Sequence, residues 1–152
     1  MSVQILEKTD THSIATWGRV MLLVWNARST GPGIDSAHAH LRGWAKGSSV
    51  LINVVPPQPA RPPDEETRAA MERATQDPIP GLRGVGTIYE GGGFIAAAIR
   101  SLVSRLQLLR KGETMRFFRT PEEAALWAAQ TLGAPGLSGE GLAEAIRQAR
   151  AG

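Results

Sequence analysis

The chain has 152 residues, 42% of them hydrophobic, and a formal net charge of +3, which suits a single domain with its own core. It contains no cysteine, so disulfides, thiolate metal sites and cysteine nucleophiles are excluded. The N-terminus lacks the pattern of a signal peptide, and no apolar run approaches the ~20 residues that cross a bilayer. We therefore expect a cytoplasmic protein without a membrane span.

The N-terminal part predicts three strands, over residues 3–7, 13–17 and 20–26. The third is apolar from Val20 to Trp25, which is typical of a strand covered on both faces. The first two alternate more and favour an antiparallel edge. Residues 26–33, rich in Ser, Thr, Gly and Pro, predict a loop.

The middle of the chain alternates helices with strands. Helical spacing of apolar residues predicts a helix over 34–46. The apolar run 50–55 predicts a strand, and the proline-rich stretch 56–63 ends it because proline cannot donate to the ladder. Asp64 is expected to cap a second helix, and a strand over 84–89 follows.

Three consecutive glycines connect strand 84–89 to a predicted helix over 94–110. A bend of this kind leaves backbone N–H groups free at the positive end of the helix dipole, so it predicts a site for an anion or a polar partner loop. In the competing interpretation the glycines only permit positive φ and close packing. The predicted helix carries an apolar stripe made of Phe94, Ala97, Ala98, Leu102, Leu106 and Leu109.

The C-terminal part begins with a strand over 115–118. A capping box with proline at the first helical position, Thr120-Pro121-Glu122-Glu123, then predicts a helix over 121–132.

Residues 133–152 form a Gly-rich break and a short C-terminal helix or flexible tail, separate from a domain over 1–132. Leu142, Ile146 and Ala149 give this segment a short apolar stripe. Such a helix is marginal alone in water, so we leave open whether it docks on its own domain, docks on a second subunit or frays.

Alternation with short connections predicts an α/β fold with a mostly parallel sheet covered by helices. The loops that leave parallel strands meet at one edge of a sheet, which is where such folds bind ligands. A helix dipole contributes only ~0.3–1 kcal/mol when exposed, so Arg28 or another residue must add a charge-assisted contact. The residues expected to bind a ligand or partner there are Trp25, Asn26, Arg28, Ser29, Thr30, Tyr89, Glu90, Gly91, Gly92, Gly93 and Phe94.

The order of elements resembles the STAS-like fold and, within it, the SpoIIAA-like domains. Three strings carry the resemblance: Trp17 to Trp25, Tyr89 to Phe94, and Met115 to Ala124. The likeness covers roughly residues 3–132. It implies a mixed five- or six-stranded sheet and a non-enzymatic regulatory domain that binds protein partners, nucleotides or lipids. The Asp-Ser phosphoacceptor pair of that family is missing at the matching helix, because the pair Asp35-Ser36 lies on the first helix.

The sequence shows no catalytic constellation, and we expect no cofactor and no metal. His12, His38 and His40 lack the i, i+4 spacing of helical metal ligands. The positive charge lacks the large excess and interleaved aromatics of a nucleic-acid binder. Glu90, beside Tyr89 at a strand end, is the best candidate for an acid or base.

Three functions remain open. We expect first a non-catalytic cytoplasmic regulatory or protein-interaction module, whose Gly91–Gly93 edge contacts a protein partner or a second copy of the chain. The alternative is a protein that encloses a small acidic or lipid-like ligand between helix 34–46, helix 94–110 and the sheet. The third is a hydrolase or isomerase that uses Glu90. An enclosed apolar pocket beneath Trp25 and Phe94 favours the ligand binder, whereas a flat exposed apolar patch favours the interaction module.

Overall fold

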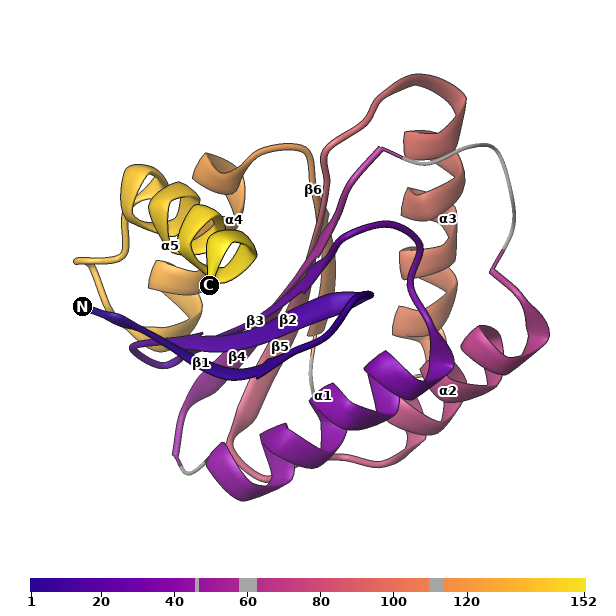
Figure 1. The fold of residues 1–152 in the computed structure, drawn as a ribbon, viewed down its shortest axis with the longest axis horizontal. Helices are drawn as coiled ribbons and strands as arrows, with labels where there is room; N and C mark the ends of the chain where they lie inside the picture. The colour runs from indigo at the N-terminus through magenta and orange to yellow at the C-terminus, as the bar shows by residue number, and fades with distance from the viewer. Residues whose placement is uncertain (46, 58–62, 110–113) are drawn as a thin grey trace.

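A computed structural model describes residues 1–45, 47–57, 63–109 and 114–152. The strands of these residues form one mixed sheet of six, in the order β1-β2-β3-β4-β5-β6 (Figure 1). The first three strands pair antiparallel, and β3 to β6 run parallel. The strands are β1 (Val3–Lys8), β2 (His12–Trp17), β3 (Val20–Trp25), β4 (Ser49–Val55), β5 (Leu82–Tyr89) and β6 (Thr114–Phe118). The predicted α/β class with a mixed sheet is therefore confirmed.

The helices cover both faces of the sheet. Each parallel crossover steps one strand further in the same direction, and such crossovers are right-handed, so the three crossover helices share one face. The two helices after β6 cover the opposite face (Figure 1). In the described residues the helices are α1 (Gly31–Trp44), α2 (Glu65–Gln76), α3 (Gly93–Leu109), α4 (Pro121–Leu132) and α5 (Gly139–Ala151).

The start of α1 corrects the sequence prediction. The helix begins at Gly31, inside the segment predicted as a loop, and ends at Trp44. Thr30 caps it, because its Oγ1 accepts a hydrogen bond from the Gly33 N–H at 3.1 Å. Proline at the first turn loses no helical hydrogen bond, so a Gly-Pro-Gly sequence that resembles a loop here forms the opening turn.

Two other helix starts confirm their predicted caps. Asp64 Oδ1 accepts from the Thr67 N–H at 2.8 Å at the start of α2. Thr120 Oγ1 accepts from the Glu123 N–H at 3.2 Å at the start of α4. The core of the predicted proline-rich segment, residues 58–62, and the predicted helix ends at 46 and 110 lie outside the described residues.

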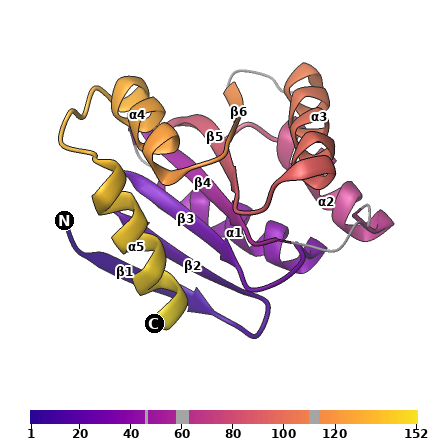
Figure 2. The ribbon, with the colours of Figure 1, turned by 90° about the horizontal axis from the view of Figure 1, so that it is seen from above.

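The face under α4 and α5 is closely packed. Small residues of α4, Ala124, Ala125 and Ala128, lie buried against the strands. Leu142, Ile146 and Ala149 of α5 belong to the same core, so the C-terminal helix docks on its own domain. It crosses β1, β2 and β3 (Figure 2).

The opposite face is covered less closely. At one point α1 approaches the sheet tightly, since a Cβ on Gly33 would lie 2.5 Å from the Trp25 ring. Away from that point α1 packs on α2, and α2 in turn on α3. A space remains between these three helices and the strands, and it forms the candidate site.

Candidate functional site

A cavity of about 640 Å³ lies between the sheet and α1, α2 and α3. This volume falls within the ~300–1,000 Å³ typical of small-molecule sites. Two rows of side chains from neighbouring strands make its floor. One row is Leu51 and Val85, joined by Met115, and the other is Leu23, Asn53 and Thr87.

One polar residue, Asn53, lies in the otherwise mainly apolar floor of the cavity. Alternate residues of β4 face the cavity, and the neighbours of Asn53 on that face, Leu51 and Val55, are apolar. Its Oδ1 accepts a hydrogen bond from Trp25 Nε1 at 2.6 Å. Because Trp25 is only 1% exposed, this bond satisfies a donor that has no access to water. Besides this acceptor oxygen, the Asn53 side chain carries two N–H donors.

The walls are apolar. Met71 and Ala74 of α2 and Ile99 and Leu102 of α3 line the cavity. The sequence predicts an apolar stripe on α3, but several side chains of this stripe border the cavity or the solvent instead of packing against other residues. Phe94 is 80% exposed, although it lines the cavity, so the cavity reaches the surface at the start of α3.

The charged residues of the lining are mainly positive. Among the described lining residues, Arg28, Arg68 and Arg105 stand against a single carboxylate, Glu72. Asp64 lies nearby, and its pKa is lowered first by hydrogen bonds from Thr67 and then by the positive charges of Arg28 and Arg68. The half-buried His38 also lines the cavity, with its Nε2 3.4 Å from Asp77 Oδ2.

The cavity brings together four of the predicted site residues, Trp25, Arg28, Ser29 and Phe94. The loop after β3 and the start of α3 therefore border the same cavity.

Most of the remaining predicted residues have structural partners of their own. Asn26 Nδ2 donates to the Asp10 carbonyl at 3.0 Å, and Thr30 caps α1. Tyr89 is buried, and a Cβ on Gly91 would lie 2.6 Å from its hydroxyl oxygen. Gly93 has φ of +67°, which favours glycine. None of these residues lines the cavity, and neither does Gly92.

Glu90 is held in an ion pair. Arg150 Nη1 donates to Glu90 Oε2 at 3.0 Å, and Arg150 Nη2 donates to the other carboxylate oxygen. Arg150 belongs to α5, which covers the face opposite to the cavity. This bidentate geometry joins the end of β5 to the C-terminal helix.

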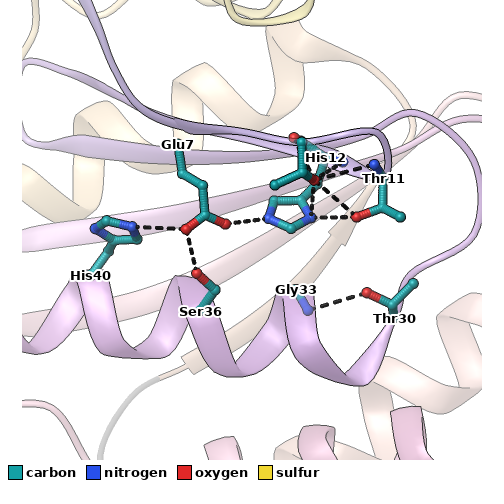
Figure 3. A network of polar contacts seen from close by, with 8 residues as sticks. Glu7, Thr11, His12, Thr30, Gly33, Ser36 and His40 are labelled. Atoms are coloured by element: carbon teal, nitrogen blue, oxygen red, sulfur yellow. Dashed lines mark hydrogen bonds and ion pairs between the residues drawn. The ribbon is translucent and has the colours of Figure 1, made fainter.

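A second polar cluster ties the β1–β2 hairpin to α1 (Figure 3). Glu7 Oε1 accepts from Ser36 Oγ at 2.7 Å and lies 3.3 Å from His40 Nε2. Glu7 Oε2 lies 2.6 Å from His12 Nε2, and His12 Nδ1 lies 2.7 Å from Thr11 Oγ1. The pKa of Glu7 is lowered, first by the Ser36 hydrogen bond, which burial partly opposes, and further by the hydrogen bonds with His12 and His40.

This cluster does not have the arrangement of a serine hydrolase. A nucleophilic serine must share its proton with a base that a third group orients. Here Ser36 and both histidines converge on the same carboxylate, and Ser36 Oγ is bonded to Glu7 instead of to an imidazole. The arrangement serves as a clamp between the sheet edge and the first cavity helix.

Five residues of the cavity and of the clamp were not predicted from the sequence: Asn53, Thr87, Arg68, Arg105 and Glu7. Asn53 had a usable signal, because a polar residue inside a fully apolar strand needs a partner or a purpose. The two arginines gave no such signal, because in the sequence they resemble ordinary solvent-exposed residues on helix faces. Glu7 and Ser36 are 29 residues apart, and only the packing of α1 on the hairpin brings them together.

Among the described residues no group of His, Asp and Glu side chains is placed to hold a metal ion. No helix in that part of the chain has the length and apolar character needed to cross a membrane.

Comparison with protein-family models, with curated proteins and with solved structures gave no match for this chain. Its function must therefore be argued from the geometry of the site.

Proposed function

We propose that the protein binds a small anionic amphiphile, with an apolar chain inside the cavity and an acidic group beside the arginines. The observation that supports this most directly is the 640 Å³ cavity with apolar walls between the sheet and α1–α3. Trp25 and Phe94, the two residues named by the ligand-binding hypothesis, both line this cavity, which supports the proposal.

The energetics suit a chain-bearing ligand. Burying one methylene contributes about 0.8 kcal/mol, so eight methylenes contribute about 6 kcal/mol. A hydrogen bond to a charged group adds about 1.5–3 kcal/mol. Before the cost of association is deducted, together they reach the ~8 kcal/mol that corresponds to a micromolar complex, which the glycine bend alone does not approach.

The charges favour an acidic headgroup. Arg68 and Arg105 lie on the two helices that flank the cavity, with Arg28 on the loop before α1. A guanidinium group matches the two oxygens of a carboxylate or phosphate. Glu72 is the one carboxylate of the described cavity lining. Asp64 lies near Arg28 and Arg68, but the arginines outnumber these two carboxylates, so a cationic headgroup finds less support than an anionic one.

A titration series tests the proposal. Isothermal titration calorimetry would compare decanoate, decanol and decyltrimethylammonium, which share a chain but differ in headgroup. We expect decanoate to bind most tightly and Arg68→Glu to weaken it about tenfold or more. Arg83→Glu, a matched charge reversal at an exposed arginine outside the cavity lining, should leave binding unchanged. Equal affinity for all three headgroups, or no binding, would overturn the proposal.

A regulatory or protein-interaction module of STAS-like type is the second candidate. The exposure of Phe94 next to the Gly91–Gly93 bend supports it, because a large exposed aromatic suits a docking edge. Sedimentation equilibrium would test self-association at this edge. Gly92→Asp should abolish a dimer while the helix content stays unchanged, and a monomeric wild-type protein would remove this support.

A further inference from the structure

Exposed large hydrophobic side chains gather on α3. Phe94 is 80% exposed, Leu108 is 86% exposed and Leu109 is 48% exposed. Elsewhere in the described residues such side chains are Met1, before β1, Ile5 on β1 and Leu126 on α4. One helix therefore presents half of this exposed apolar set.

Phe94 and Leu108 lie on the same edge of α3. They are 14 positions apart, and at 3.6 residues per turn this places them about 40° apart around the helix. Between them the edge holds Ala98 and Ser101, both exposed and small. The two large side chains therefore project from the ends of a narrow ridge.

The charges of α3 are of one sign. Its sequence contains Arg100 and Arg105 and no Asp or Glu. Arg105 falls on the same edge as Phe94 and Leu108 by helical spacing and also lines the cavity. Long arginine side chains can lay their aliphatic part on an apolar surface while the guanidinium group stays at a charged boundary.

We propose that this edge of α3, from Phe94 to Leu108, docks on the surface of an anionic lipid bilayer. Phe94 and Leu108 provide apolar anchors, Arg105 lies on the same edge, and the helix carries no carboxylate, a combination that favours an anionic interface. Two projecting apolar side chains are a small contact beside the ~800 Å² per partner that stable protein interfaces bury, which disfavours a second copy of the chain. The acidic residues Glu65, Glu66 and Glu72 belong to the neighbouring helix α2 and not to α3.

The cavity lies next to the proposed docking edge, which indicates what the docking would be for. Phe94 and Arg105 line both the cavity and the docking edge, so a docked molecule has its cavity mouth at the bilayer. A chain-bearing anion can then pass from the membrane into the protein. This step rests on the proposed function for the identity of the ligand, whereas the docking itself does not.

Co-sedimentation with lipid vesicles tests the docking. We expect the wild-type protein to sediment with vesicles of phosphatidylcholine and phosphatidylserine, and much less with phosphatidylcholine alone. Leu108→Ser removes an anchor that does not line the cavity and should reduce partitioning by about tenfold. Leu126→Ser, on α4 at 61% exposure, is the matched control and should change nothing.

The outcomes separate the two proposals. Absence of sedimentation with anionic vesicles, or equal losses in Leu108→Ser and Leu126→Ser, overturns the docking. A stable dimer in light scattering that Leu108→Ser dissolves also overturns it, in favour of a second copy. Titration of decanoate without vesicles should give the same affinity for wild type and Leu108→Ser. If decanoate fails to bind while vesicles do, the proposed function falls and the docking stands.

Discussion

The two faces of the sheet are covered by helices in different ways. Under α4 and α5 small residues such as Ala124, Ala128 and Ala149 lie fully or almost fully buried, in one core with Leu142. Under α1–α3 a cavity of about 640 Å³ remains, and Ile99, Leu102 and Met71 border its open space. We infer that the first face stabilises the fold and the second is built for a ligand.

The largest expected effect contrasts two leucines. Leu142 is fully buried under α5, so Leu142→Ala should lower the free energy of unfolding by about 2–5 kcal/mol. Leu102 is half-buried at the cavity, and the same change there should cost much less because fewer contacts are lost. Urea unfolding measures both, and equal costs would show that the two faces are packed alike.

Substitutions that add side-chain volume test the same difference between the two faces of the sheet. Ala128→Leu places extra methyl groups in the packed face and should destabilise the protein by about 1–3 kcal/mol. Ala98→Leu places them in the cavity, so it should leave stability nearly unchanged and weaken decanoate binding. Thermal unfolding measures the stability of both variants, and a parallel decanoate titration measures their binding. Strong destabilisation by Ala98→Leu would argue against open space at α3.

The Trp25–Asn53 hydrogen bond gives a smaller effect. Asn53→Leu leaves the buried Trp25 N–H without its partner, which costs about 1–3 kcal/mol, partly offset by burial of the new apolar side chain. Unfolding experiments on Asn53→Leu and Asn53→Gln measure this cost. A neutral outcome for Asn53→Leu would mean that Asn53 is not needed to hold the cavity floor.

The smallest effect concerns pH. The pKa of Glu7 is lowered in the fold, so its clamp stabilises the protein above the ordinary value of about 4.5. This contribution is lost as the pH falls through the lowered pKa. We expect Glu7→Gln to reduce the loss of stability between neutral and acidic pH, as followed by urea unfolding. An unchanged acid dependence would show that Glu7 is not part of the transition.

Local signals made much of this fold predictable. The caps at Asp64 and Thr120 and the apolar runs of β3 and β4 depend on neighbouring residues, and they were identified correctly. The start of α1 was missed because its Gly-Pro-Gly turn is compatible with both a loop and a capped helix.

The candidate site was harder to predict from the sequence than the fold. Helical spacing indicates which side of α3 faces inward, but it does not tell whether neighbouring elements fill the space in front of Leu102. The depth of the cavity depends on how far α2 and α3 stand from the strands. The Glu7–Ser36 contact likewise depends on packing between segments that are distant in the chain.

Methyl chemical shifts recorded while decanoate is added test the central claim most directly, because methyl groups lie on both faces of the sheet. We expect saturable shifts at Leu23, Met71 and Ile99 around the cavity, with little change at Leu142 and Ile146 of α5. Saturable shifts centred on the α4–α5 face, or no shifts at the cavity methyls, would contradict it.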